Sequence, residues 1–191
     1  MGHGARGDYF QSHLALASRM PPPLRAAGAL GISYRPKTNE DLDFIERLYR
    51  STREEELALT DWPETFKRQF IAQQQFAQDH HLKLSHPEAE WLIVEREGEP
   101  IGRLYIEDLG AKLWLIDIAL MPGSRGCGIG GAIIGDLIAQ GRDEGKTVGL
   151  TVFKTNVARR LYERLGFTLV SDAEAYHEMI WTGDGGASGE A

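Results

Sequence analysis

Hydrophobic residues recur with a period of two in some stretches of the chain and with a period near 3.6 in others, which predicts both strands and helices. The alternation over Ile32–Arg35 predicts a first strand. Thr38 fits the N-cap of a first helix, because apolar residues at helical spacing follow it: Leu42, Ile45, Leu48 and Tyr49. Pro63 suits the first position of a second helix, whose apolar residues are Phe66, Phe70, Ile71 and Phe76.

The second half of the chain carries stronger patterns. Trp91–Glu95 and Ile101–Ile106 predict a hairpin, joined by a turn over Glu97–Pro100. Further on, the pattern predicts a strand, a helix, a strand, a short helix ended by Gly166, and two closing strands: Lys112–Met121, Gly128–Gly145, Val148–Val152, Val157–Leu165, Phe167–Val170 and Tyr176–Trp181. The order β-α-α-β-β-β-α-β-α-β-β predicts an α/β domain in which helices cover a mixed sheet.

The two ends of the chain differ in composition from the rest. Of 191 residues in all, residues 1–30 are rich in Gly, Arg and Pro, and residues 182–191 are mostly Gly and small or acidic residues. Such segments bury little apolar surface, so we expect a flexible extension and a disordered tail. The folded unit is predicted to span residues 31–181, which suits one domain.

Charge and cysteine content narrow the class of protein. The formal net charge of −7 argues against binding to nucleic acid, whose phosphates attract Lys and Arg, and is compatible with a cationic acceptor such as an amine. No apolar run approaches the roughly 20 residues that cross a membrane, and no signal peptide is evident. Cys127 is the single cysteine, so we expect no intrachain disulfide and a cytoplasmic location. His80, His81 and His86 lack metal-ligand spacing, and no metal site is predicted.

A glycine-rich turn joins the apolar strand to the helix that follows it, with the sequence Arg125-Gly126-Cys127-Gly128-Ile129-Gly130-Gly131. Glycine leaves main-chain N–H groups uncovered, and the first turn of a helix adds unpaired donors, so this turn predicts an anion site for a diphosphate. Residues 126–131 also match the Gly-x-Gly-x-x-Gly dinucleotide fingerprint. That fingerprint belongs directly after a first strand, and Lys154 stands where it needs an acid, so we disfavour the nucleotide alternative.

The turn resembles the Arg/Gln-x-x-Gly-x-Gly/Ala motif of the GNAT superfamily (Gcn5-related N-acetyltransferases), with matches at Arg125, Gly128 and Gly130. A second stretch resembles the family's following helix, with matches at Asn156, Ala158, Leu161, Tyr162, Gly166 and Phe167. The resemblance covers about residues 31–181 and is strongest over residues 115–167. It implies a mixed, mostly antiparallel sheet of six to seven strands with about four helices. It also implies direct transfer of an acetyl group from acetyl-CoA to a primary amine.

The same resemblance assigns binding roles to particular residues. Backbone groups of residues 125–131 would hold the CoA pyrophosphate, and main-chain atoms of Leu120 and Met121 would bind the pantetheine arm. Asn156 would meet the pantetheine amides, although capping of the helix explains it equally well. Arg159 and Arg160 would reach phosphate groups, or else form a solvated helix face.

The chemistry needs an acid for the leaving thiolate and a base for the ammonium of the acceptor. The resemblance makes Tyr162 the acid, because a phenol with a pKa near 10 stays protonated at neutral pH; core packing is the alternative. Deprotonating an alkyl ammonium at pH 7 costs about 4–5 kcal/mol, and Asp117, a charged residue inside an apolar strand, is the candidate base. An ion pair of purely structural role is its alternative. Weaker candidates are Glu107, Asp108, Glu54, Glu56 and Asp61.

Several questions stay open at the level of the sequence. A module that binds acyl-CoA without turnover is the alternative function. The acceptor is a polyamine, an amino acid, an aminoglycoside or a protein amino terminus, since its determinants are expected in residues 40–90, where the motif signal is weakest. The resemblance also raises homodimerisation through the last strands.

Overall fold

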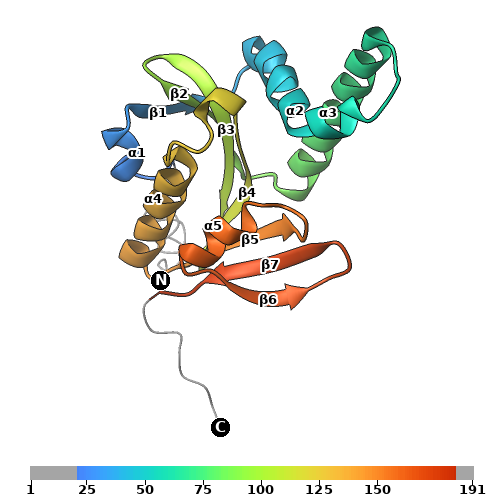
Figure 1. Cartoon of the computed structure of the whole chain (residues 1–191). Helices are drawn as coiled ribbons and strands as arrows, with labels where there is room; N and C mark the ends of the chain where they lie inside the picture. The colour runs from blue at the N-terminus through green and yellow to red at the C-terminus, as the bar shows by residue number, and fades with distance from the viewer. Residues whose placement is uncertain (1–20, 184–191) are drawn as a thin grey trace, which may run out of the picture.

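The protein folds around one sheet with helices on both faces (Figure 1). The computed structural model describes residues 21–183. Its sheet has seven strands in the order β1-β2-β3-β4-β5-β7-β6. All neighbouring strands are antiparallel except β4 and β5, which are parallel. The predicted mixed, mostly antiparallel sheet is therefore confirmed.

The elements follow the predicted order, with one short helix added at the start. The strands are β1 (Ile32–Pro36), β2 (Glu90–Arg96), β3 (Glu99–Asp108), β4 (Lys112–Leu120), β5 (Thr147–Phe153), β6 (Thr168–Asp172) and β7 (Tyr176–Trp181). The α-helices are α1 (Ala26–Ala29), α2 (Leu42–Ala58), α3 (Glu64–Ser85), α4 (Ile129–Glu144) and α5 (Arg159–Arg164). Two 3₁₀ turns, η1 (Asn39–Asp41) and η2 (Pro122–Ser124), precede α2 and α4.

The helix boundaries have local causes that the sequence indicates. Thr38 and Asp41 form a capping box at the start of η1 and α2, with the Thr38 N–H donating to Asp41 Oδ2 over 2.8 Å. Helix α4 ends at Glu144 and is capped by Gly145, whose φ of 66° lies in the left-handed region that glycine tolerates. These interactions fix where α2 begins and where α4 ends.

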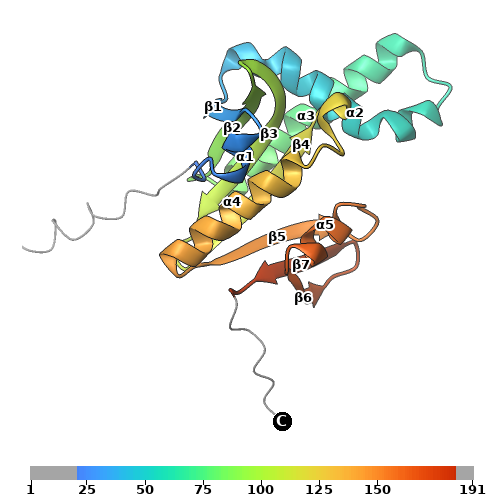
Figure 2. The ribbon, with the colours of Figure 1, turned by 60° about the vertical axis from the view of Figure 1, so that its left-hand side comes forward.

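The main core lies between α4 and one face of the sheet. Ile133, Ile134 and Leu137 of α4 are buried against strand residues such as Leu104 and Leu115. A smaller cluster on the opposite face packs Phe44, Ile45 and Leu48 of α2 on Ile93 of β2. Figures 1 and 2 show α4 on one side of the sheet and the α2–α3 pair on the other.

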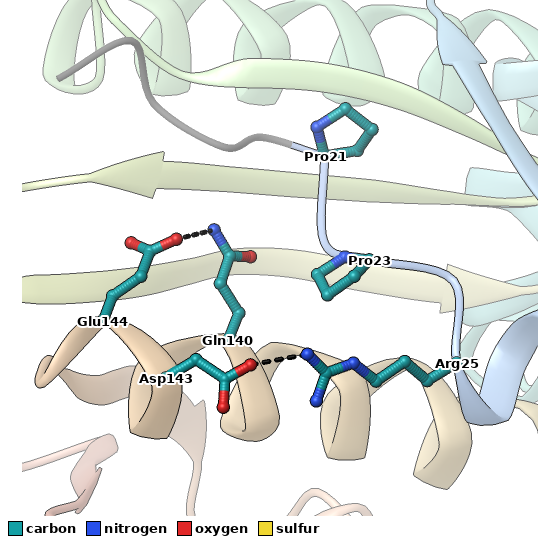
Figure 3. Close-up of a pocket in the computed structure, with 6 residues that line it drawn as sticks. All are labelled: Pro21, Pro23, Arg25, Gln140, Asp143 and Glu144. Carbon is teal, nitrogen blue, oxygen red and sulfur yellow. Dashed lines mark hydrogen bonds and ion pairs between the residues drawn. The ribbon is translucent and has the colours of Figure 1, made fainter. Parts of the chain in front are cut away.

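Residues 21–30 correct the predicted domain boundary. Their composition predicts a flexible extension, but they contain α1, which packs on α4 with Ala27 fully buried. The carboxylate of Asp136 on α4 accepts the N–H groups of Arg25, Ala26 and Ala27 over 2.8–3.0 Å. Figure 3 shows the Arg25 guanidinium turned toward Asp143 beside a small pocket over the C-terminal half of α4. The predictions for residues 1–20 and 184–191 lie outside the described residues.

Candidate functional site

Strands β4 and β5 separate halfway along their length. They pair only over Lys112–Leu115 and Thr147–Leu150. Opposite β3, Tyr105 pairs with Asp117 and Ile106 with Leu115, so Ile116 is an extra, bulged residue. Beyond the bulge β4 and β5 run apart (Figure 1), while the other edge of β5 stays paired with β7 as far as Phe153. We call this opening between Ile116–Leu120 and the end of β5 the splay.

The glycine-rich turn closes the end of the splay and leads into α4. Gly126 and Gly128 have φ values of 74° and 81°, and a side chain built on either would meet open space. Within residues 21–183, no backbone N–H from Gly126 to Gly131 donates a hydrogen bond to a protein group. The positive end of the α4 dipole lies at the same place. The residues of the turn therefore fit a diphosphate.

The glycines of the turn serve two different purposes. Gly130 and Gly131 face Leu161 of α5, where an added Cβ would lie 3.6–4.0 Å from its methyl groups. Their small size thus also allows α5 to pack closely on α4. Between the glycines, Cys127 is exposed and Ile129 is buried in the core.

The Arg125 side chain braces the turn instead of pointing at open solvent. Its Nε donates to the Leu120 carbonyl over 2.7 Å, and its Nη2 donates to Ser51 Oγ on α2 over 2.9 Å. The arginine therefore ties the turn to the end of β4 and to α2. Ser51 is a part of the site that sequence reasoning missed, because nothing in the spacing of α2 links it to residue 125.

The two predicted pantetheine contacts differ. Met121 donates its N–H to the Ile101 carbonyl over 2.8 Å and accepts the Ser124 N–H over 2.9 Å, so both its main-chain groups are engaged. The N–H of Met121 is therefore not free for a ligand, and its main-chain contact with pantetheine stays a prediction that rests on the second lone pair of its carbonyl oxygen. Main-chain groups alternate direction along a strand, so the N–H of Leu120 points the other way, into the splay. Leu120 keeps its predicted place.

Across the splay, Tyr162 of α5 is buried against Phe167, with ring centroids 5.8 Å apart. Burial, and then the nearby charge of Asp117, raise the pKa of Tyr162 to about 12. No protein group in residues 21–183 hydrogen-bonds to its hydroxyl. The phenol is therefore protonated at neutral pH and open to a ligand.

The start of α5 presents the other predicted residues. Asn156 Oδ1 accepts the Ala158 N–H over 2.9 Å in the turn that leads into α5, whose N-cap position is Ala158. Both interpretations of Asn156, helix capping and contact with pantetheine, stay predictions. Arg159 donates to Glu163 over 2.8 Å on an exposed face. A surface pocket lies here, lined by Lys154, Thr155, Asn156, Val157, Arg159, Arg160 and Glu163. Two of its cations are already paired, Lys154 with Asp172 and Arg159 with Glu163, so a role in binding phosphate groups stays a prediction.

Asp117 lies on the β4 edge of the splay, on the face opposite α4. Its Oδ2 accepts from Arg103 Nε over 2.6 Å, and its side chain is 25% exposed whereas that of Arg103 is 3% exposed. Burial works to lower the pKa of Arg103, but the Asp117 charge offsets this and raises it. Sequence reasoning missed Arg103, although the charge inside the apolar run Ile101–Ile106 was a usable signal.

The weaker base candidates lie elsewhere. Glu107 is paired with His86 over 2.6 Å, and Asp108 with Lys146 over 2.6 Å, both near the end of β3 that lies opposite the start of β4. Glu54 and Glu56 form exposed ion pairs within α2, and Asp61 is exposed between α2 and α3. None of these five carboxylates is brought to the splay.

Comparison with known proteins identifies the class. Residues 44–167, more than half of the chain, match the model of the acetyltransferase (GNAT) family. The chain therefore belongs to this family. A stretch of 64 residues is 41% identical to the [ribosomal protein bS18]-alanine N-acetyltransferase of Haemophilus influenzae. This match spans 33% of the chain and 44% of that protein, less than half of its length.

Solved structures share the fold at low sequence identity. The PaiA N-acetyltransferase of Thermoplasma acidophilum, solved in complex with coenzyme A, has a TM-score of 0.58 and 18% identity over 79% of this chain and 98% of its own. The RimJ protein of Mycobacterium smegmatis, solved with CoA-disulfide, has a TM-score of 0.54 and 14% identity over 82% and 84%. Within residues 21–183, no helix combines the length and the apolar character that crossing a membrane requires.

Proposed function

We propose that this chain transfers an acetyl group from acetyl-CoA directly to a primary amine. The observation that carries the proposal is the run of backbone N–H groups from Gly126 to Gly131, at the end of the splay, that have no hydrogen-bond partner among the described residues. A diphosphate held there would direct the rest of coenzyme A along the opening between β4 and β5. Membership of the GNAT family supports the same assignment.

The residues around the splay supply the proposed chemistry. The amine attacks the thioester carbonyl carbon, forming a C–N bond, and the C–S bond breaks when the tetrahedral intermediate collapses. Tyr162 gives its phenolic proton to the departing thiolate, and Asp117 accepts the proton lost by the amine. In the same scheme, the N–H of Leu120 donates to the pantetheine arm, while Asn156 and Arg159 border its path.

The acceptor is proposed as a protein amino terminus. The supporting observation is the match to an enzyme whose name specifies an alanine of ribosomal protein bS18. We also propose a cytoplasmic location, which the single cysteine supports. Homodimerisation through β6 and β7 stays a prediction, to be tested by sedimentation.

Replacing Tyr162 separates an enzyme from a module that only binds acyl-CoA. We expect Tyr162→Phe to lower kcat about 10²- to 10⁴-fold and to leave the Kd for acetyl-CoA unchanged. The assay follows CoA release with acetyl-CoA and a panel of amines, including short peptides with a free alanine amino terminus. Tyr34→Phe is the matched control, because it removes another hydroxyl, which is buried and unpartnered within residues 21–183, on β1.

Two results would contradict the proposal. If the wild-type protein shows no heat of association with acetyl-CoA or CoA in calorimetry, the turn does not hold a diphosphate. If it binds acetyl-CoA but releases no CoA with any amine, it is a binding module.

A further inference from the structure

Helix α3 contacts the sheet through polar and charged side chains. Lys37 of the chain after β1 is paired with Asp79, Arg103 Nη2 donates to Gln78 Oε1 over 3.1 Å, and His86 contacts Glu107. The apolar residues of α3 instead pack on α2, where Ile71 and Phe70 meet Tyr49 and Leu57. Removing charges from water costs free energy that pairing only partly offsets, so a buried layer of this kind calls for an explanation.

Arg103 connects the charged layer to the splay. It is 2% exposed, and its Nε and Nη2 bind two different elements, Asp117 on β4 and Gln78 on α3. Its Nη1 is buried and has no hydrogen-bond partner among the described residues. Asp117 is therefore the anion that compensates this buried cation, and the geometry of their contact is constrained from the Arg103 side.

The two oxygens of Asp117 have different surroundings. Oδ2 is held by Arg103, whereas no protein group within residues 21–183 hydrogen-bonds to Oδ1. The side chain remains 25% exposed, so one oxygen is accessible to a ligand in the splay. A rigid guanidinium that binds one oxygen fixes the direction of the other.

We propose that Arg103 is a positioning residue, which holds the Asp117 carboxylate so that its second oxygen faces the amine of the acceptor. The proposal rests on the proposed acetyl transfer and extends it to a residue outside the family's motifs. The competing explanation is that Arg103 and Asp117 only neutralise each other in the fold. Both explanations predict that a single substitution is harmful, so single variants do not separate them.

A neutral pair separates them. Asp117→Asn leaves Arg103 buried without a counterion, and this variant can fail to fold. The double variant Arg103→Gln/Asp117→Asn removes both charges together and restores a pair of amides that can hydrogen-bond. We expect its Tm to return close to that of the wild type, while its kcat stays about 10²-fold lower or more, with the Kd for acetyl-CoA unchanged.

Arg103→Lys and Arg103→Gln complete the test. Lysine keeps the charge but loses the planar fork, so we expect a kcat between that of the wild type and that of Arg103→Gln. If Asp117→Asn folds, adding Arg103→Gln to it should lower kcat no further, because a residue that acts through Asp117 has nothing left to position. The matched control is the ion pair between Asp108, at the far end of β3, and Lys146, just before β5, whose neutral variant Lys146→Gln/Asp108→Asn should keep the wild-type kcat.

The outcomes distinguish this inference from the function on which it rests. Recovery of kcat together with Tm in the neutral double variant overturns the positioning role and leaves acetyl transfer intact. A wild-type kcat in folded Arg103→Gln does the same. Absence of turnover in the wild type overturns both.

Discussion

The two faces of the sheet hold their helices by different means. On the α4 face, Ile134 and Leu137 pack on strand residues that are themselves apolar and fully buried. A buried carboxylate on that side, Asp136, is satisfied by three backbone N–H groups. On the opposite face α2 adds a small apolar cluster, but α3 meets the sheet through polar contacts. Asp79 forms an ion pair with Lys37, Gln78 accepts a hydrogen bond from Arg103, and His86, just after α3, contacts Glu107.

The difference indicates that one face of the sheet mainly supports stability, whereas the other carries the charged groups near the proposed site. Apolar packing tolerates small changes, because its energy is spread over many weak contacts. A buried ion pair is instead a single strong interaction, and removal of either charge leaves the other uncompensated. The α4 face thus forms the stable frame of the domain. The face that α3 covers, which we call the ionic face, carries buried charged side chains and borders the splay.

The largest expected effect is on the ionic face. Asp79→Asn changes one atom but leaves Lys37, 7% exposed in its side chain, without its counterion. We expect a loss of about 3–5 kcal/mol in the free energy of unfolding at pH 7, measured by urea denaturation. The neutral variant Lys37→Met/Asp79→Leu should recover most of it. A loss in Asp79→Asn no larger than that from deleting one buried methylene would contradict the comparison.

The same contrast decides what the sequence can predict. The strands, the helices and the glycine turn follow from period, capping and backbone requirements, which are local, and the structure confirms them. The placement of Tyr162 followed from a contiguous motif. The side-chain partners on the ionic face cannot be predicted in this way. The contacts of Arg103 and Asp79 depend on how the strands pair and how α3 packs on the sheet. The alternation of side chains along β3 places Arg103 on the same face as Tyr105 and Glu107, but it does not predict that its partner is Asp117.

The prediction of a flexible extension over residues 21–30 was wrong for a related reason. Their composition suggests a loose extension, since it shows no apolar periodicity. What orders α1 is one carboxylate, Asp136, more than 100 residues away in sequence. Met121 likewise looked available as a strand end, and only the pairing with Ile101 shows that its N–H is engaged.

A second, smaller effect tests the ionic face at its edge. Hydrogen bonds from Arg35 hold the pKa of Asp41 at about 2, below its usual value near 4. Because the folded-state pKa is lowered, its stabilisation is present above pH 4 and is lost as the pH falls toward 2. In urea denaturation at pH 7, Asp41→Asn should therefore lower the free energy of unfolding by about 2 kcal/mol relative to the wild type. This difference should shrink between pH 4 and pH 2.

The exposed pair of Glu64 and Arg50 is the control for that experiment, because water and salt screen it. Glu64→Gln should leave the urea midpoint essentially unchanged at every pH. A difference between Asp41→Asn and the wild type that stays constant down to pH 2 would show that the ion pair is not its source.

The glycine turn joins the two faces and supports a matched comparison. Gly128 and Gly98 have φ values of 81° and 82°, and a Cβ on either meets no protein atom within 4 Å. Alanine at each should cost about 1–2 kcal/mol of stability, because both adopt the left-handed conformation. Only Gly128→Ala should also weaken acetyl-CoA binding, by about tenfold or more in calorimetry, since its Cβ would occupy the place of the diphosphate. Equal CoA affinities in the two variants would remove the turn from the binding site.

The smallest effect is expected on the apolar face. Ile134 is 1% exposed in the main core, and Ile134→Val removes a single methylene, for an expected loss of about 0.5–1.5 kcal/mol in urea denaturation. Leu84→Ala on α3 is the control, because it removes more atoms from a side chain that is 71% exposed and should change stability by less than about 0.5 kcal/mol. Neither variant alters a charge or a group at the splay, so both should keep the wild-type kcat. If Ile134→Val instead lowered kcat without lowering stability, the α4 face would take part in catalysis, and the division between a structural face and a reactive face would not hold.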